Sequence, residues 1–180
     1  MGFSSASVDC YAAGSPDWVV TAATMRAIET ALFEAGMPVA ALMEKVVQRI
    51  VAWVIAAYPR ATYPQVVVLV GPGHNGGDAL GVAREMAQRG YAVGVVDPTE
   101  RHKDLTASHR RYVRALGVPI SPTLPHGQDL EAVDLWIDGL FGFGLERPLE
   151  GGLADIVAAV NAHPAPVVSL DVPSGLHSDT

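Results

Sequence analysis

The sequence predicts an α/β protein in which a mostly parallel sheet lies between helices. Short β-branched runs alternate with segments of helical periodicity, a pattern that favours right-handed βαβ units with helices on both faces of a sheet. A length of 180 residues, 49% of them hydrophobic, suffices for one domain with a full core. We expect an irregular arm over residues 1–18 and one domain over residues 19–180, in which an N-terminal helical pair precedes the sheet.

The helical pair is expected before the first strand. Its first helix begins after Thr21, a suitable N-cap, and ends at Gly36. The second begins near Pro38, a residue favoured in a first helical turn, and ends before Pro59. The apolar residues of this second helix form one predicted face: Leu42, Val46, Ile50, Trp53 and Val54.

Four strands and three helices are expected after this pair. The strands cover residues 66–70, 91–96, 135–138 and 167–170, and the helices about residues 78–89, 105–116 and 152–162. This order predicts a three-layer α/β/α Rossmann-like sandwich with a mostly parallel central sheet. Because ligands of such sheets bind outside the carboxyl ends of the strands, the loops after Val70, Ile137 and Leu170 are the candidate site.

The composition excludes several classes of protein. A net charge of -7 with scattered Arg residues argues against a nucleic-acid partner, which requires clustered basic residues. The most apolar stretch, residues 46–57, is interrupted by Gln48 and Arg49 and is too short to cross a membrane. Cys10 is the only cysteine, so an internal disulfide is excluded. Residues 1–18 lack the pattern of a secretory signal, and we expect a cytoplasmic protein.

The first candidate loop, residues 71–78, has the sequence GPGHNGGD. It places G-x-G-x-x-G between a strand and a helix, and Asp97 ends the next strand where a ribose-binding acid would lie. The glycines allow a ligand close to the backbone, and the N–H groups at the helix start favour an anion. The alternative is a tight turn whose Asp78 complements the helix dipole. His74 lies inside this loop and is a candidate for direct ligand contact.

The two lysines, Lys45 and Lys103, are not expected near the end of a strand. A dinucleotide phosphate would therefore be held largely by backbone N–H groups and helix ends. The histidines at positions 102, 109, 126 and 163 are interpreted as surface or loop residues.

The second and third loops add oxygen-bearing side chains. Asp138 ends a buried strand, where a carboxylate needs a cation or hydrogen-bond donors, and the glycine-rich segment that follows can wrap a ligand. The alternative for Asp138 is a helix cap or a partner for Arg147. The third loop begins at Asp171 and contains Ser174, and its alternative is an ordinary Asp/Ser turn. Together with Asn75 of the first loop, these oxygens suit an alkali or alkaline-earth cation better than zinc.

The three loops together resemble those of the NAD(P)H-hydrate epimerases, also called the YjeF N-terminal domain. The segments that carry the resemblance are VVVLVGPGHNGGDALGVAREMAQRG, VDLWIDGLFGFGLERPLEG and VVSLDVPSG, preceded by the similar VVTAATMRAIETALFEAGMPVAALMEKV. The resemblance implies interconversion of the R and S epimers of hydrated NADH and NADPH (NADHX and NADPHX). It also implies functional coupling to an ADP- or ATP-dependent dehydratase, fused or separate, and a homodimer.

The resemblance also assigns site residues. It implies a potassium ion bound by Asn75, Asp138 and Ser174. It implies substrate contacts by residues of all three loops: His74, Asn75, Gly76, Gly77, Asp78, Gly142, Phe143, Gly144, Leu145, Glu146, Arg147, Pro148 and Asp171. Three residues depart from the family pattern, namely His74, Ala79 and Phe143, where Asn, Gly and often Thr are usual. Because family members usually continue beyond the third motif, we expect a domain truncated at its C-terminal end.

Acid/base chemistry at C6 of the hydrated nicotinamide ring is the mechanistic hypothesis. Asp171 would handle the hydroxyl proton, and Asp78 is a second candidate. Two other functions stay open. One is an NAD(P)-dependent oxidoreductase, for which a Tyr-x-x-x-Lys pair is missing. The other is a noncatalytic nucleotide- or protein-binding module, because domains of this family also serve as interaction scaffolds.

Overall fold

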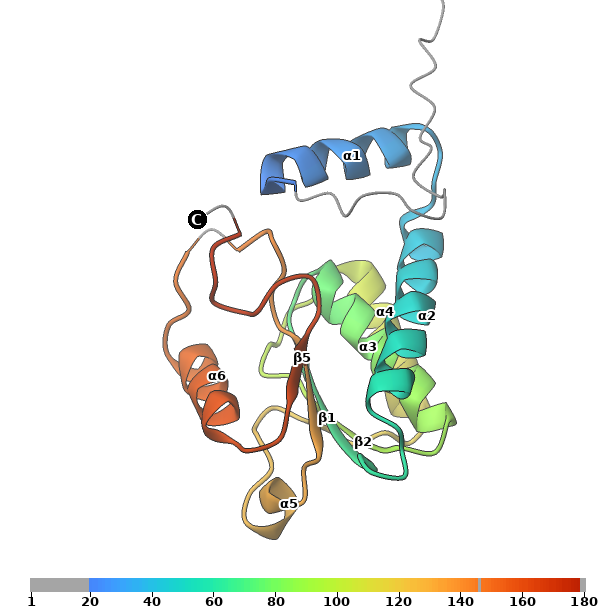
Figure 1. The fold of residues 1–180 in the computed structure, drawn as a ribbon. Coiled ribbons are helices and arrows are strands. Elements are labelled where there is room, and N and C mark those ends of the chain that lie inside the picture. Colours follow the sequence, from blue (N-terminus) through green and yellow to red (C-terminus); the bar gives the residue numbers. More distant parts are fainter. Residues whose placement is uncertain (1–19, 146, 179–180) are drawn as a thin grey trace, which may run out of the picture.

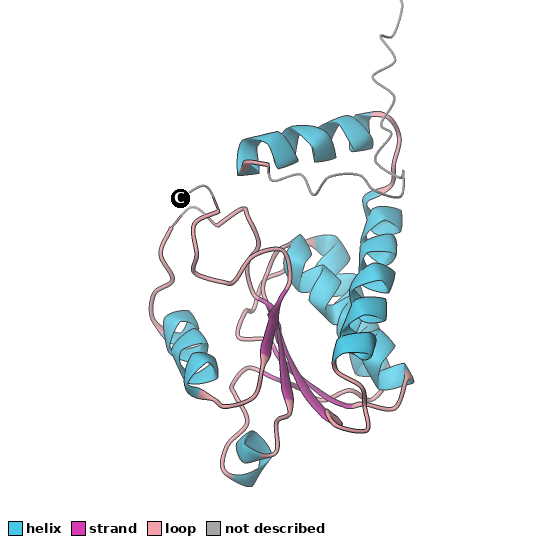
Figure 2. Cartoon of the chain, viewed as in Figure 1, coloured by secondary structure: helices cyan, strands magenta, loops and turns pink. Residues whose placement is uncertain are grey.

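The computed structural model describes residues 20–145 and 147–178, so the arm expected over residues 1–18 lies outside the described residues. Figure 1 shows the strands in the centre and helices on both sides of them, and Figure 2 marks the strands in magenta. The helices are α1 (Ala22–Glu34), α2 (Val39–Ala57), α3 (His74–Gln88), α4 (Asp104–Ala115), α5 (Gln128–Glu131) and α6 (Gly152–Ala162). The strands are β1 (Gln65–Val70), β2 (Ala92–Val96), β3 (Ile120–Ser121), β4 (Leu135–Gly139) and β5 (Val167–Ser169).

The sheet has the order β3-β2-β1-β4-β5, and each neighbouring pair is parallel. Helices α2, α3 and α4 cover one face, and α6 covers the other (Figure 1). Alternate residues of β1 belong to different apolar clusters: Val66 and Val68 pack with α2 and α3, whereas Val67 and Leu69 pack with Trp136 and α6. The predicted three-layer sandwich is confirmed.

The site is positioned by a change of direction in the strand order. From β1 the chain adds β2 and β3 on one side, and then returns to add β4 and β5 on the other. Leu69 pairs with Asp138 and Val70 with Gly139, so the loops after β1 and β4 leave the sheet next to each other. This is the switch point at which doubly wound sheets bind ligands.

Three elements differ from the sequence-based expectation. Helix α3 begins at His74 and not at Asp78, because Gly73 serves as the N-cap and the Gly77 N–H already donates to the Gly73 carbonyl at 3.3 Å. Much of the expected first loop is therefore the first turn of a helix. The short elements β3 and α5 lie in the proline-containing segment for which no element was predicted.

The predicted apolar face of α2 is confirmed for Val54, which is buried, and for Ile50, which packs against the core. It is wrong for Val46 and Trp53. Its fully buried residues are Met43, Val47, Val51 and Val54, whereas Val46 and Trp53 are 37% and 57% exposed. The helix is apolar on more than one face, and packing on α3 selects one of them. Gly81 of α3 faces Val47 so closely that a Cβ on Gly81 would lie 2.5 Å from a Val47 methyl group.

Helix α1 begins at the predicted N-cap: the Thr24 N–H donates to the Thr21 hydroxyl at 3.2 Å. Figure 1 shows α1 lying across the end of the domain, away from the sheet. Ile28 and Leu32 on this helix are 45% and 43% exposed. Its Met25 and Glu29 line the cavity described below.

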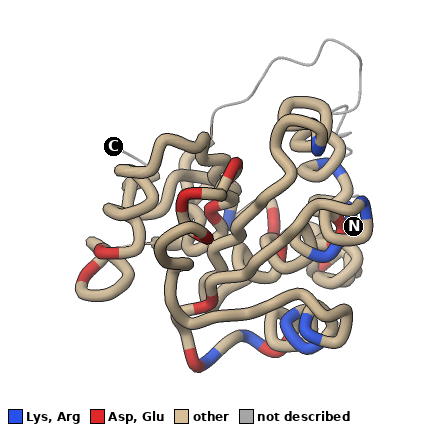
Figure 3. Tube along the Cα trace, turned by 90° about the horizontal axis from the view of Figure 1, so that it is seen from below, with Lys and Arg blue, Asp and Glu red and all other residues tan. Residues whose placement is uncertain are grey.

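Charged and apolar residues are distributed along the described chain as follows. Figure 3 shows the Lys and Arg positions at several separate places along the trace, with Asp and Glu positions between them. Within residues 20–145 and 147–178, no helix is both long enough and apolar enough to cross a bilayer.

Candidate active site

A cavity of about 630 Å³ opens at the carboxyl ends of the strands, between the loops after β1, β4 and β5 and the helices α1 and α2. Of the predicted substrate-binding residues, eight line it: His74, Asn75, Asp78, Gly142, Phe143, Gly144, Leu145 and Asp171. Gly76, Gly77, Arg147 and Pro148 are not among the lining residues, and Glu146 lies outside the described residues.

Gly76 and Gly77 have a packing role in this structure. A Cβ on Gly76 would lie 1.9 Å from the Gly71 carbonyl oxygen, and one on Gly77 would lie 2.8 Å from the Met43 methyl group. Both glycines are buried and allow α3 to approach the loop and α2 closely. Arg147 and Pro148 are exposed on the segment beyond the cavity.

Asp171 is held against the second loop by its side chain. Its Oδ2 atom accepts a 2.7 Å hydrogen bond from the Phe143 backbone N–H. A Cβ on Gly142 would lie 2.3 Å from the same oxygen, so the carboxylate occupies the space that this glycine leaves. Asp171 also has a φ of 70°, and such left-handed residues other than glycine occur preferentially at functional sites.

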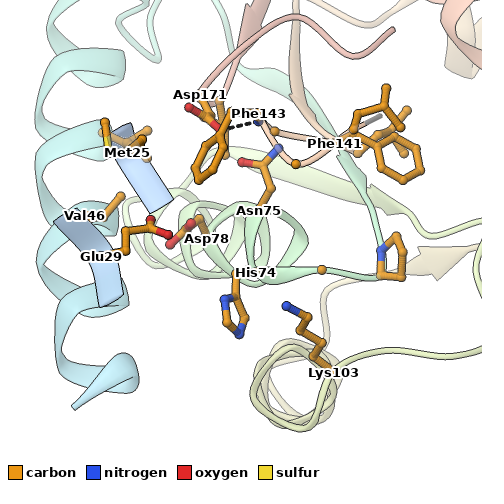
Figure 4. A pocket seen from close by; sticks show the side chains of 18 residues that line it. Met25, Glu29, Val46, His74, Asn75, Asp78, Lys103, Phe141, Phe143 and Asp171 are labelled. Carbon is orange, nitrogen blue, oxygen red and sulfur yellow. Dashed lines mark hydrogen bonds between the residues drawn. The ribbon is translucent and has the colours of Figure 1, made fainter. Parts of the chain in front are cut away.

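Asp78 is the most perturbed carboxyl group of the cavity. Its Oδ1 atom is buried and has no hydrogen-bond partner among the described residues. Burial, with the charges of Asp171 and Glu29 as lesser causes, raises the pKa of Asp78 to about 7. Figure 4 shows the Glu29 and Asp78 carboxylates next to each other. Because α3 begins at His74, Asp78 lies beyond the first helical turn, and the alternative role as a first-turn acid is not supported.

Glu29 is a cavity residue that the sequence did not indicate. It reaches the cavity from α1, and burial together with the Asp171 charge raises its pKa, while Lys103 partly opposes this shift. Three carboxyl groups from three separate elements therefore gather at one end of the cavity.

Asp138 and Ser174 are both buried and are in direct contact. The Ser174 hydroxyl donates to Asp138 Oδ1 at 2.7 Å, and the Ser174 N–H donates to Oδ2 at 2.9 Å. Leu140 N–H and the Ser169 hydroxyl each add a longer bond of 3.2 Å. These donors are neutral and none belongs to Arg147, so the alternative of an Asp138–Arg147 pair is not supported.

Asn75 lies beside this pair. A Cβ on Gly139, the residue after Asp138, would be 3.3 Å from the backbone carbonyl oxygen of Asn75. The Asn75 amide nitrogen is buried without a hydrogen-bond partner among the described residues. Carboxylate, hydroxyl and amide groups are oxygen-bearing side chains of the type that suits an alkali or alkaline-earth cation. In the described part of the chain, no three His, Cys, Asp or Glu side chains gather as metal ligands.

Lys103 is the second cavity residue that sequence reasoning missed. It is the N-cap of α4, and it is the only Lys or Arg among the lining residues within the described chain. Its backbone N–H donates to the Pro72 carbonyl at 3.0 Å, which ties the loop after β2 to the loop after β1. The expectation that neither lysine lies near a strand end is wrong. The carboxyl-end rule applies equally to the loop after Val96, and it would have indicated this residue.

Asp97, the proposed ribose acid, is fully engaged within the protein. Its side chain is 0% exposed. Oδ1 accepts from His102 Nε2 at 2.9 Å and from the Thr99 hydroxyl at 3.0 Å, and Oδ2 accepts from Arg110 Nε. Burial alone would raise the pKa of Asp97, but the bonds from Arg110 and His102 outweigh it and lower the pKa. This arrangement removes the main support for a hydride-transferring dinucleotide site.

The interpretation of the four histidines as surface or loop residues is wrong for His109, which lies inside α4. His102 and His163 lie in loops, but neither is exposed. The His102 and His109 side chains are 6% and 10% exposed. His163 accepts a 3.1 Å hydrogen bond from the Trp136 indole and contacts the Leu130 carbonyl through its other ring nitrogen. Only His126 is exposed.

A Rossmann-like sandwich with a polar cavity at its switch point defines a ligand-binding α/β domain. The family described as YjeF-related protein N-terminus matches residues 39–180, and the chain belongs to this family. This confirms the resemblance drawn from the three loop motifs.

Relatives of known name support the same assignment. The "NAD(P)H-hydrate epimerase" of Limosilactobacillus fermentum is 37% identical, and the alignment covers 89% of this chain and 76% of that protein. The "Bifunctional NAD(P)H-hydrate repair enzyme Nnr" of Thermosynechococcus vestitus is 56% identical over 90% of this chain, which spans 32% of that enzyme's length. The crystal structure of the yeast protein ynu0 (YNL200c) is similar, with a TM-score of 0.77 and 27% identity over 88% of this chain and 71% of that one.

Proposed function

We propose that this chain is an NAD(P)H-hydrate epimerase, an isomerase that interconverts the R and S epimers of NADHX and NADPHX. The name of the Limosilactobacillus relative supports the reaction. The observation that carries the proposal is the arrangement of Asp171. Its carboxylate is fixed by the Phe143 N–H at the edge of a cavity that Asp78 also lines.

The two carboxyl groups differ in the role that their surroundings favour. In ring opening, Asp171 accepts the proton of the C6 hydroxyl as the C6–N1 bond breaks, C6 becomes an aldehyde carbon and N1 is protonated; Asp171 returns the proton when N1 attacks the other face of C6. Asp78, whose pKa is about 7, carries a proton in a substantial fraction of molecules near neutral pH and can donate it to the ring. In the alternative route through an iminium-like species, Asp78 would protonate the C6 hydroxyl, which leaves as water, and Asp171 would accept a proton from the water that adds to the other face of C6.

We also propose potassium as the resident ion. Asn75, Asp138 and Ser174 are the residues that would hold it, one from each loop. Its charge would balance the buried Asp138 carboxylate and keep the three loops in register. The residues of this chain then bind and orient the substrate and move its proton.

The place of the reaction in the cell is part of the same proposal. The name of the Thermosynechococcus relative supports functional coupling to a second repair activity. We propose an ADP- or ATP-dependent dehydratase, fused or separate, that consumes the S epimer in the cytoplasm. We further propose a homodimer through α1 and α2, whose Ile28, Leu32 and Trp53 are exposed, and sedimentation velocity would measure it.

The direct test follows conversion of (R)-NADHX to (S)-NADHX by chromatography, with and without potassium. Asp171→Ala and Asp171→Asn are the matched variants, and Asn tolerates the left-handed backbone of this position. We expect rapid equilibration by the wild type and loss of it in both folded variants. Wild-type rates in Asp171→Asn would remove Asp171 from the mechanism. Binding of NADPH without any conversion by the folded wild type would instead favour a noncatalytic nucleotide-binding module.

A further inference from the structure

The acidic and basic residues of the cavity lie at different ends. Glu29, Asp78 and Asp171 lie at one end, and Lys103 lies at the other beside His74, whose pKa is lowered by burial and by the Lys103 charge (Figure 4). Both groups line the same cavity. The Lys103 charge also partly opposes the rise of the Glu29 pKa that burial and Asp171 cause. A ligand with one anionic part and one uncharged part would therefore have a preferred orientation.

We infer that Lys103 binds a phosphate group of the dinucleotide substrate, so that the uncharged hydrated ring enters the carboxylate end and meets Asp171. The inference rests on the proposed function for the identity of the substrate, and it deepens that function by adding a binding residue and an orientation. A pyrophosphate at the opposite end would face three carboxyl groups. The Arg26 guanidinium at that end lies over the Phe143 ring, 5.7 Å from its centroid, and Arg26 is not among the residues that line the cavity in the described chain.

The backbone that carries Lys103 is fixed from several directions. The Lys103 N–H is bonded to the Pro72 carbonyl. The preceding residue, His102, is bonded to the buried Asp97 carboxylate at 2.9 Å. Three residues later, the Thr106 hydroxyl donates to the Gly73 carbonyl at 2.8 Å. Because the backbone is held on both sides, little ordering is needed at the main chain when the ammonium group binds an anion.

The neighbourhood of Lys103 suits a phosphate. Gly73 is the N-cap of α3. A Cβ added to Gly73 would have no other atom within 4 Å, so there is space for a ligand at the start of this helix. The backbone N–H of Lys103 donates a hydrogen bond to the carbonyl of Pro72, the residue just before this N-cap. An ammonium group supplies a charge that the helix end alone provides only in part.

Three variants test the inference. Lys103→Gln removes the charge, Lys103→Arg keeps it, and Lys45→Gln makes the same charge change at an exposed residue of α2 that does not line the cavity. Steady-state epimerisation and calorimetric titration with NADPH are measured for each. We expect Lys103→Gln to raise both the KM and the NADPH Kd about tenfold, the effect of losing one charge-assisted hydrogen bond, with kcat within about twofold. Lys103→Arg should recover most of the affinity, and Lys45→Gln should match the wild type.

Several results would overturn the inference. One is an equal NADPH Kd for Lys103→Gln and Lys45→Gln. Another is a fall in kcat at constant KM, which would place Lys103 beside the reacting ring. The titration does not depend on catalysis. If the wild type binds NADPH but does not epimerise NADHX, a selective loss of affinity in Lys103→Gln still supports the phosphate contact, while the proposed activity fails. If the folded wild type does not bind NADPH, the phosphate contact is refuted.

Discussion

Asp171 and Phe143 belong to different loops and are joined by a 2.7 Å hydrogen bond from the Phe143 backbone N–H to Asp171 Oδ2. The bond is short because Gly142 leaves room for the carboxylate beside the chain. The position of the proposed acid/base group therefore depends on a glycine in another loop. A substitution of this glycine could therefore move the carboxylate while it leaves the hydrophobic core intact.

Gly142→Ala is expected to lower epimerisation at least tenfold while changing the free energy of unfolding by less than about 1 kcal/mol. The added Cβ would lie 2.3 Å from Asp171 Oδ2, the end of a flexible side chain that can move away. Gly152→Ala is the matched control, because no atom lies within 4 Å of the added Cβ there. Chromatographic rates and thermal unfolding of both variants are the measurements. Full activity in Gly142→Ala would show that the position of Asp171 does not limit the reaction.

Asp78 is expected to make the protein less stable as the pH rises. Its pKa increases from 3.8 to about 7 in the folded state, so between these values the folded protein binds more protons than the unfolded chain. The free energy of unfolding then falls with increasing pH. Below pH 4 both states are protonated and the cost disappears. Above pH 7 the cost is complete, on the order of 4 kcal/mol for a pKa that rises from 3.8 to about 7.

Asp78→Asn removes this titration. Relative to the wild type, its melting temperature should therefore rise between pH 5 and pH 8. Glu29→Gln should reduce the pH dependence without removing it, since the Glu29 charge is only one of three causes of the shift. A constant difference between Asp78→Asn and the wild type across this range would show that Asp78 ionises normally.

The sequence could predict those parts of the fold that depend on local patterns. Alternation of β-branched runs with helical periods determined the layers, and the residues after Val70, Ile137 and Leu170 were correctly placed at one cavity. The buried face of α2 could not be predicted, because it depends on the contact of Val47 with Gly81. Val47 is one of many apolar residues in α2, and Gly81 is one of several small residues in α3. Only the three-dimensional packing shows that these two residues meet.

The missed cavity residues have a similar explanation. Lys103 reaches the cavity because β2 pairs with β1, so the loops that follow these two strands lie next to each other. The hydrogen bond from the Lys103 N–H to the Pro72 carbonyl joins the two loops. Glu29 reaches it because α1 crosses the open end of the domain. The sequence position of Asp97 is that of a ribose-binding acid, but Arg110 of α4 donates a hydrogen bond to its carboxylate. These outcomes depend on how elements far apart in the chain are arranged.

Asp97→Asn is expected to destabilise the protein by about 2–3 kcal/mol, because it leaves the buried His102 side chain and the partly exposed Arg110 without a charged partner. Denaturation in urea at pH 7 would measure the change. Asp104→Asn, at an exposed acid in the first turn of α4, should cost less than about 1 kcal/mol. A change below 1 kcal/mol in Asp97→Asn would mean that this carboxylate is not paired in solution and is available to a ligand.

Potassium is expected to stabilise the folded protein through the site at Asp138. An ion that binds only the folded state raises the free energy of unfolding by RT ln(1 + [K⁺]/Kd), about 2.7 kcal/mol at one hundred times the Kd. The melting temperature should thus be higher in potassium chloride than in tetramethylammonium chloride of equal ionic strength, because the larger cation does not fit among three oxygens.

Asp138→Asn should abolish the difference between the two salts, since it removes the negative charge of the site. Ser174→Ala and Asn75→Ala should reduce it, and they provide readouts if loss of the Asp138 charge prevents folding. Ser174→Ala also removes the 2.7 Å bond to Asp138, so its melting temperature in tetramethylammonium chloride is the reference for that structural cost. Equal melting temperatures of the wild type in both salts would show that the four neutral donors around Asp138 are sufficient and that no potassium ion is bound there.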